Sequence, residues 1–113
     1  MNKRLLGTAG EAIASAYLEN RSFTILARNY RNKVGEIDII AIKGERIHFI
    51  EVKSRNNCKY GLGREAVTYS KQQTIRRVAE AYLITNGLHN KIDISFDVFE
   101  ISGDETEHLV SCF

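Results

Sequence analysis

The stretch GEIDIIAIKGERIHFIEVKSR, residues 35–55, alternates apolar and polar residues on both sides of a polar KGER turn. Alternation with a period of two is typical of a strand that buries one face. The stretch therefore predicts a β-hairpin with strands at 35–42 and 47–55. Three charged residues interrupt its isoleucine-rich pattern: Asp38, Glu51 and Lys53.

The expected register of this hairpin brings two acidic residues face to face. With the turn centred on residues 44–45, the numbers of opposed residues add to 89, so Asp38 faces Glu51 and Glu36 faces Lys53. Side chains alternate along a strand, so all four project from one face. Apolar residues share that face: Ile40, Ile42, Ile47 and Phe49. Like charges directly opposite each other destabilise a sheet, so we expect a cation between Asp38 and Glu51.

A divalent metal ion is the expected cation, with Mg²⁺ or Mn²⁺ held by Asp38 and Glu51. Mg²⁺ binds one or two carboxylates and completes its coordination with waters and phosphate oxygens. The backbone carbonyl of Val52 is a further candidate ligand, and Lys53 places an ammonium beside the ion. The alternative is that Asp38 bonds to backbone at a strand end, while Glu51 and Lys53 face solvent on an edge strand. Glu36 is interpreted as a partner of Lys53 rather than as a ligand.

The rest of the chain supplies helices and further strands. Residues 4–20 carry apolar residues at helical spacing and predict an amphipathic helix. Its expected apolar face comprises Leu5, Leu6, Ala9, Ala12, Ile13, Ala16 and Tyr17. Further elements are expected as strands at 23–30 and 92–98, an edge strand within 108–113, and a helix from Ser70 to a stop at Gly87. The order helix, three strands, helix, strand predicts an α/β layer fold.

Composition limits the class of protein. A chain of 113 residues, 43% of them hydrophobic, suffices for one domain spanning 1–113 and not for two. The two cysteines, Cys58 and Cys112, lack C-x-x-C spacing, so they indicate neither a disulfide framework nor a zinc site and fit a reducing cytoplasm. No segment approaches the roughly 20 apolar residues of a membrane span. The start of the chain is interpreted as the first helix of a cytoplasmic protein, not a signal peptide.

Basic residues flank the acidic hairpin. The net charge of +2 divides into +4 for residues 1–34, −2 for 35–52, +6 for 53–77 and −6 for 78–113. A cation-rich surface around a carboxylate cluster suits a polyanion that meets a metal ion. For the charge distribution alone, a mixed solubilising surface is the simpler explanation.

Four motifs resemble one protein family across nearly the whole chain: GTAGEAIASAYL, GEIDIIA, FIEVKSR and YGLGREAVTYSKQQTIRRVAEAYL. They are similar to the YraN family of uncharacterised bacterial proteins, which itself resembles the PD-(D/E)xK nuclease superfamily. EVKSR is also similar to the archaeal Holliday junction resolvases. The resemblance implies a restriction-endonuclease-like αβββαβ core, a mixed sheet flanked by helices, which agrees with the order of elements above.

The resemblance also implies roles for individual residues. It places metal ligation on Asp38 and Glu51, the catalytic lysine at Lys53 and the first-helix carboxylate at Glu11. Ile37 occupies the position of the superfamily's proline, which removes no chemical group. From the helix pattern alone, Glu11 lies away from the expected apolar face. There it either reaches the sheet edge near the metal or stays exposed near the helix start.

Candidate contacts to nucleic acid follow the hairpin. The loop SRNNCKYGLG offers Arg55, Lys59 and the aromatic Tyr60, a composition suited to nucleic acid and equally to a plain connection. Lys71 and Gln72 lie in the first turn of the second helix, where a phosphate can bind, and the resemblance supports Lys71. No ligand role is expected for the scattered histidines His48, His89 and His108.

Two functions remain open. The first is a metal-dependent nuclease acting on phosphodiester bonds, branched DNA included, in which Lys53 orients the nucleophile or neutralises developing charge. The second is a nucleic-acid-binding module with the same fold, whose cleavage is weak, absent or dependent on a partner. The expected partner is nucleic acid, DNA in the first place. The resolvase resemblance is also compatible with a two-fold homodimer formed through an edge strand.

Overall fold

The computed structural model describes the backbone of residues 3–55 and 67–113, and the side chains of residues 9–54 and 67–113. Within these residues the elements are α1 (Lys3–Glu19), β1 (Thr24–Arg31), β2 (Glu36–Lys43), β3 (Arg46–Arg55), α2 (Tyr69–Thr85), β4 (Asp93–Ser102) and β5 (Glu105–Leu109). The described strands form one mixed sheet in the order β1-β2-β3-β4-β5, with β3 and β4 parallel. The predicted αβββαβ core is therefore confirmed, and β5 follows it at the sheet edge.

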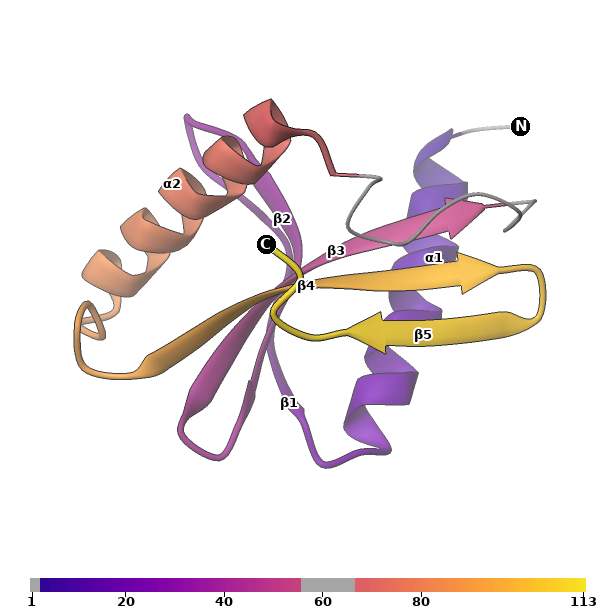
Figure 1. Cartoon of the computed structure of the whole chain (residues 1–113), viewed down its shortest axis with the longest axis horizontal. Coiled ribbons are helices and arrows are strands. Elements are labelled where there is room, and N and C mark those ends of the chain that lie inside the picture. The colour runs from indigo at the N-terminus through magenta and orange to yellow at the C-terminus, as the bar shows by residue number, and fades with distance from the viewer. Residues whose placement is uncertain (1–2, 56–66) are drawn as a thin grey trace.

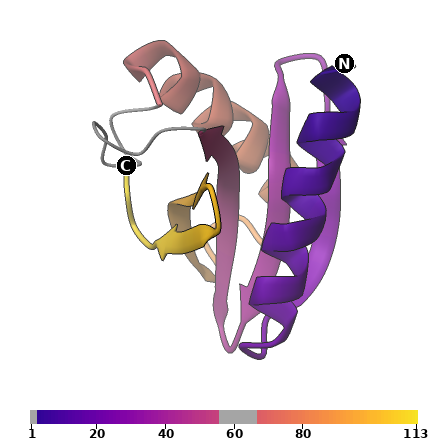
Figure 2. The ribbon, with the colours of Figure 1, turned by 90° about the vertical axis from the view of Figure 1, so that its right-hand side faces the viewer.

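The two helices cover opposite faces of the sheet, as Figures 1 and 2 show. The α2-side cluster comprises Ile37, Ile40, Ile47, Phe49, Val67, Ile75, Val78, Ala79, Leu83, Phe96 and Val98. The α1-side cluster comprises Ala14, Leu18, Ile39, Ala41, Ile50, Phe99 and Ile101. Both faces of the central strands are thus buried, as in other sheets covered by helices on each side. In the described part of the chain, no helix is long and apolar enough to cross a membrane.

The β2–β3 hairpin has the predicted register. Lys43 pairs with Arg46 and Ile39 pairs with Ile50, and the turn residue Gly44 has a φ of 63°. The ladder between the two strands ends at Ile39 and Ile50, after which β2 continues beside β1 and β3 beside β4. Figure 1 shows the start of β2 running toward α2 while the end of β3 runs the other way. We call the region beyond Ile39 and Ile50 the β2–β3 fork.

The alternation of side chains along β2 is interrupted at this fork. Ile37 and Ile40 both belong to the α2-side cluster, although strict alternation would place them on opposite faces. On β1, the residue opposite Asp38 is Asn29, which has a positive φ of 53°. Positive φ in a residue other than glycine marks a local irregularity. Strict alternation along β2 therefore does not determine the face of the sheet on which the Asp38 side chain lies.

The buried face of α1 differs from the predicted one. The buried positions are Gly10, Glu11, Ala14, Ser15 and Leu18, whereas Ala9, Ala12 and Ala16 are exposed and Ile13 is 48% exposed. Small residues decide the difference, because they let the helix lie close to the sheet. A Cβ on Gly10 would lie 3.0 Å from Ser54 Oγ and 3.6 Å from Val52 Cγ1. Close packing of backbone against the sheet thus turns Glu11 inward.

Two element boundaries also differ from the sequence expectation. α2 begins at Tyr69, one residue early, because the Thr68 hydroxyl accepts a hydrogen bond from the Lys71 amide at 3.2 Å and caps the helix. β5 spans Glu105–Leu109 and begins earlier than predicted. The turn before it uses Gly103 at a φ of 60°, a conformation that glycine adopts without strain.

Gly35→Ala is expected to destabilise the fold, because Gly35 lies where the β1–β2 turn meets α2. A Cβ there would lie 2.5 Å from Thr74 Cγ2. Thr74 is held in place, since its hydroxyl donates to the Ser70 carbonyl at 3.2 Å. Overpacking of this kind costs about 1–3 kcal/mol. Urea denaturation measures the loss, and in a Thr74→Ala background the same change should cost little. An unchanged midpoint for Gly35→Ala alone would contradict the close contact.

Candidate functional site

The acidic residues singled out in the hairpin meet at the β2–β3 fork. Asp38 lies on β2, and Glu51 lies on β3. Asp38 Oδ2 accepts a hydrogen bond from the Val52 amide at 2.8 Å, beyond the last ladder pair of the two strands. The alternative interpretation of the sequence has Asp38 bonding to backbone, and this hydrogen bond is such a contact. It also holds the Asp38 carboxylate against β3, next to Glu51.

Glu51 is a buried acid beside a second acid. The residue is only 5% exposed. Burial, a hydrogen bond with Asp38 and the negative charge of Asp38 raise the pKa of Glu51 to about 8, against the opposing charges of Lys71 and Lys53. Without a further cation, Glu51 therefore keeps its proton at neutral pH and donates it to Asp38. The positive charge near the fork is therefore too small to keep both acids ionised at neutral pH.

Two lysines approach Glu51 from different elements. Lys71 Nζ, on α2, lies 3.5 Å from Glu51 Oε2, and Lys53 Nζ, on β3, lies 3.9 Å from the same oxygen. Their side chains remain 43% and 33% exposed, respectively. Because both ammonium groups keep contact with solvent, they can bind a phosphate as well as the carboxylate. The predicted grouping of Asp38, Glu51 and Lys53 is thus present, with Lys71 added to it.

Glu11 reaches the same fork from α1. It is 5% exposed, and its Oε2 has no hydrogen-bond partner in the described part of the chain. Burial raises the pKa of Glu11, as do the charges of Asp38 and Glu36, while a hydrogen bond with Asn29 and the charge of Arg28 oppose the rise. The sequence left Glu11 either near the site or exposed. The structure shows it buried and close enough to Asp38 to interact with its charge.

The donor set at the fork suits Mg²⁺ or Mn²⁺. Asp38 and Glu51 offer carboxylate oxygens, which these ions prefer as ligands, whereas the Glu11 carboxylate does not converge with both of them. A buried carboxylate oxygen without a partner, such as Glu11 Oε2, is costly unless a cation or donor satisfies it. Together with the raised pKa of Glu51, this atom indicates a site for positive charge. The backbone carbonyl of Val52 stays a predicted ligand.

Glu36 does not pair with Lys53 as predicted. Glu36 Oε2 accepts a hydrogen bond from Arg31 Nε at 2.9 Å, across the ladder between β1 and β2. The prediction extended the hairpin register past the point where the strands separate. Beyond the fork, Glu36 remains with β1 and Lys53 remains with β4.

The sequence analysis missed a further acid beside Lys53. In the parallel ladder Lys53 pairs with Glu100 of β4, which is 9% exposed. Among the described residues, Glu100 Oε2 finds no hydrogen-bond partner. Only the register between β3 and β4 reveals this neighbour, and no turn connects those two strands directly. Glu100 is thus a candidate for positioning the Lys53 ammonium.

The predicted nucleic-acid contacts are described only in part. Two of them lie outside the described residues: Lys59 and Tyr60. Arg55 ends β3, and only its backbone is described. Lys71 sits in the first turn of α2, as expected, with its ammonium directed at the fork. Gln72 Nε2 donates to the Val67 carbonyl at 3.0 Å, so this amide helps to fix the start of α2.

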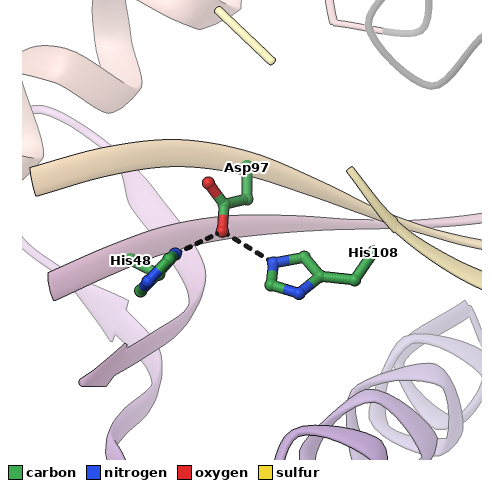
Figure 3. Close-up of side chains that lie close together, drawn as sticks. All are labelled: His48, Asp97 and His108. Carbon is green, nitrogen blue, oxygen red and sulfur yellow. Dashed lines mark hydrogen bonds and ion pairs between the residues drawn. The ribbon is translucent and has the colours of Figure 1, made fainter. Parts of the chain in front are cut away.

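Two histidines without an expected role meet at Asp97 (Figure 3). His48 Nδ1 lies 2.7 Å and His108 Nε2 lies 2.6 Å from Asp97 Oδ2. His89 is exposed in the turn after α2 and is not part of this group. The sequence correctly placed His48 on the face opposite Glu51. Its meeting with His108 depends on the registers of β3 with β4 and of β4 with β5, which the sequence does not disclose.

Comparison with known proteins gives one family. The model of "Uncharacterised protein family UPF0102" matches residues 10–101, a range that contains the fork. A UPF0102 protein of Alkaliphilus oremlandii is 44% identical over 112 residues, which cover 98% of this chain and 95% of that protein. One from Alkaliphilus metalliredigens is 49% identical over 96 residues, covering 85% of this chain and 83% of the relative. One from Clostridium botulinum is 46% identical over 96 residues, covering 85% and 78%. The resemblance found in the motifs is thereby confirmed, and the chain belongs to the uncharacterised protein family UPF0102.

Proposed function

We propose that this protein is a metal-dependent nuclease that hydrolyses phosphodiester bonds of nucleic acid, DNA in the first place. The observation that carries the proposal is the pairing of buried Glu51 with Asp38 at the fork, with the ammonium groups of Lys53 and Lys71 directed at the same carboxylate. A divalent cation relieves the repulsion of the two acids. The lysines add the positive charge that a phosphate substrate needs.

The acidic residues and the lysines have different roles in the proposed site. Asp38 and Glu51 would hold the ion, and Glu11 adds negative charge near Asp38. When bound, the ion stabilises negative charge that develops on the phosphate. Lys53 holds the attacking water or a phosphate oxygen in line, and Lys71 binds a second phosphate oxygen. Water adds to phosphorus and one P–O ester bond breaks, which leaves one phosphomonoester and one hydroxyl end.

Cleavage of a substrate panel tests the proposal. The wild-type protein, with Mg²⁺ or Mn²⁺, is expected to cut at least one of four substrates: single strand, duplex, flap and four-way junction. Chelator should stop cleavage, and Lys53→Ala should lose it. Lys91→Ala is the matched control, because Lys91 is an exposed lysine in the turn after α2. Failure of the wild-type protein to cut any substrate with either ion would leave the second function.

The second function, a nucleic-acid-binding module, rests on basic side chains that could bind nucleic acid without any cleavage. Arg28 on β1 and Lys33 in the following turn are both exposed, and Lys71 is partly exposed. These three residues could contact the nucleic-acid backbone whether or not cleavage occurs. Binding alone would then be the whole activity.

Nucleic-acid binding is expected to survive Lys53→Ala and to weaken with salt, because phosphate contacts supply most of such affinity. Three contacts on duplex DNA predict a loss of about fortyfold between 50 and 200 mM salt. Fluorescence anisotropy with a labelled duplex measures the slope. Undetectable binding at low salt, or a flat salt dependence, would contradict both proposed functions.

A further inference from the structure

The His48–Asp97–His108 cluster lies on the α1 side of the sheet, opposite to Glu51. His48 precedes Ile50 by two residues on β3, and Asp97 precedes Phe99 by two on β4; Ile50 and Phe99 both belong to the α1-side cluster. His108 of β5 pairs with Phe99. Three adjacent strands thus direct one side chain each to a common point, as Figure 3 shows.

The three side chains present their ligand atoms to one another in a nearly closed space. Asp97 Oδ2 lies 2.7 Å from His48 Nδ1 and 2.6 Å from His108 Nε2. All three atoms fall within 4.8 Å of one another. The side chains of His48 and His108 are each 7% exposed and that of Asp97 is fully buried. The two imidazoles and the carboxylate therefore meet in a space that is largely closed to solvent.

Neighbouring groups fix the orientation of each member of the cluster. The other carboxylate oxygen, Asp97 Oδ1, accepts hydrogen bonds from the Ser95 hydroxyl and, at 3.1 Å, from the Ser111 amide. The Phe23 ring packs edge-on against both imidazoles, with centroid distances of 5.0 Å to His48 and 5.6 Å to His108. Such outer contacts are what orient the ligands of metal centres and keep one carboxylate oxygen free for the ion.

The ligand atoms of the cluster are two ring nitrogens and one carboxylate oxygen. Two imidazole nitrogens and one carboxylate oxygen form a donor set typical of Zn²⁺, whereas Mg²⁺ prefers oxygen donors alone.

Small movements convert the hydrogen-bonded cluster into a coordination sphere. Zn–N and Zn–O bonds of about 2.1 Å in tetrahedral geometry separate neighbouring ligand atoms by roughly 3.4 Å. Asp97 Oδ2 and each imidazole nitrogen must then move apart by several tenths of an ångström, and His108 lies on the edge strand β5. The ring nitrogens that face Asp97 Oδ2 donate to it in the metal-free cluster, so each imidazole must carry its single proton on the other ring nitrogen when the ion binds, and both rings are then neutral.

We propose that His48, Asp97 and His108 bind Zn²⁺ at a site separate from the β2–β3 fork. Three protein ligands and one water complete a tetrahedral sphere. The ion joins β3, β4 and β5, so it cross-links the edge strand to the parallel pair. Its role is structural: binding favours the folded chain, because the unfolded chain does not present these ligands together.

Zinc titration of the full chain tests this site independently of cleavage. Metal-free protein is titrated with Zn²⁺ by calorimetry in excess Mg²⁺. The Mg²⁺ occupies the proposed site at the fork, so that the measured heat comes from the histidine cluster. One Zn²⁺ is expected per chain, together with a higher melting temperature. His108→Gln should weaken Zn²⁺ binding by more than about a hundredfold. This exceeds the loss expected when a residue that only hydrogen-bonds to a metal ligand is removed. His89→Gln is the matched control, because His89 is exposed and outside the cluster, and its affinity should equal that of the wild type.

A second measurement on the wild-type protein covers the case in which His108→Gln does not fold. Co²⁺ in place of Zn²⁺ should give the visible absorption band of a tetrahedral site. Zn²⁺ should also shift the imidazole NMR signals of two histidines and leave the third, His89, in place. Wild-type protein that binds no Zn²⁺ at micromolar concentration, or three histidine signals that stay unshifted, would overturn the proposal and leave a hydrogen-bonded cluster that only holds β5.

Discussion

Replacing Glu51 by glutamine is expected to abolish metal-dependent cleavage and, in the same protein, to raise the stability of the metal-free fold. Glu51→Gln removes a carboxylate that would hold the ion, so activity on any substrate of the panel should be lost. It also removes a buried acid whose ionisation is penalised by burial and by Asp38. The ion pairs lost with it contribute little, since Lys71 and Lys53 are both partly exposed.

The gain in stability depends on pH with a definite sign. The pKa of Glu51 is about 8 in the folded chain, against 4.5 for an unperturbed glutamate side chain. Between these two values the folded chain holds a proton that the unfolded chain has released, so wild-type stability falls as pH rises. Above pH 8 the penalty is complete, on the order of several kcal/mol. The stabilisation by Glu51→Gln should therefore be near zero at acidic pH and largest above pH 8.

Thermal melting in chelator at the two ends of this pH range measures the effect. Added Mg²⁺ should then raise the melting temperature of the wild type and not that of Glu51→Gln. Glu80→Gln serves as the control, because Glu80 is an exposed glutamate on α2 and its substitution should change neither quantity. A Glu51→Gln variant that melts below the wild type above pH 8 in chelator would show that the buried acid is not penalised.

Lys53→Arg is expected to reduce turnover by roughly a hundredfold while metal affinity is retained. If Lys53 only neutralised Glu51, the guanidinium would serve as well, because the charge is kept. A compact ammonium that positions water or a phosphate oxygen is not replaced by a planar, bulkier group. Glu100 lies beside Lys53 in the parallel ladder and is 9% exposed.

Single-turnover cleavage and metal calorimetry separate the two cases for Lys53. Reduced cleavage with unchanged metal affinity supports a positioning role for the ammonium. Undiminished cleavage by Lys53→Arg would keep the nuclease and remove Lys53 from its mechanism. Lys91→Arg, made at an exposed lysine, controls for general effects of arginine.

The hairpin could be predicted from sequence because its information is local. The turn at Gly44 and the alternating isoleucines set the register from Lys43–Arg46 to Ile39–Ile50, and this register is confirmed. The same reasoning failed for Glu36, because nothing local marks where two paired strands separate. Asp38 and Glu51 still meet, since Asp38 lies directly beyond the last ladder pair.

Long-range packing explains what the sequence left out. The apolar pattern of α1 indicated a face that includes Ile13, whereas Gly10 and Ala14 bring the opposite side of the helix onto the sheet. Hydrophobicity alone does not show how closely a helix can approach. Glu100 beside Lys53 and the two histidines at Asp97 depend on strand pairings that no turn sequence encodes.

The hydrogen bond between the Val52 amide and Asp38 gives this position two separate constraints in evolution. A relative that had lost cleavage would still need an acceptor there, because an aliphatic side chain would leave the amide without a partner where the ladder has ended. Asparagine would satisfy that need without holding a metal ion. Retention of a polar residue at position 38 is therefore a poor sign of activity among relatives. Lys53, whose ammonium is partly exposed, is the position at which inactive lineages should drift first.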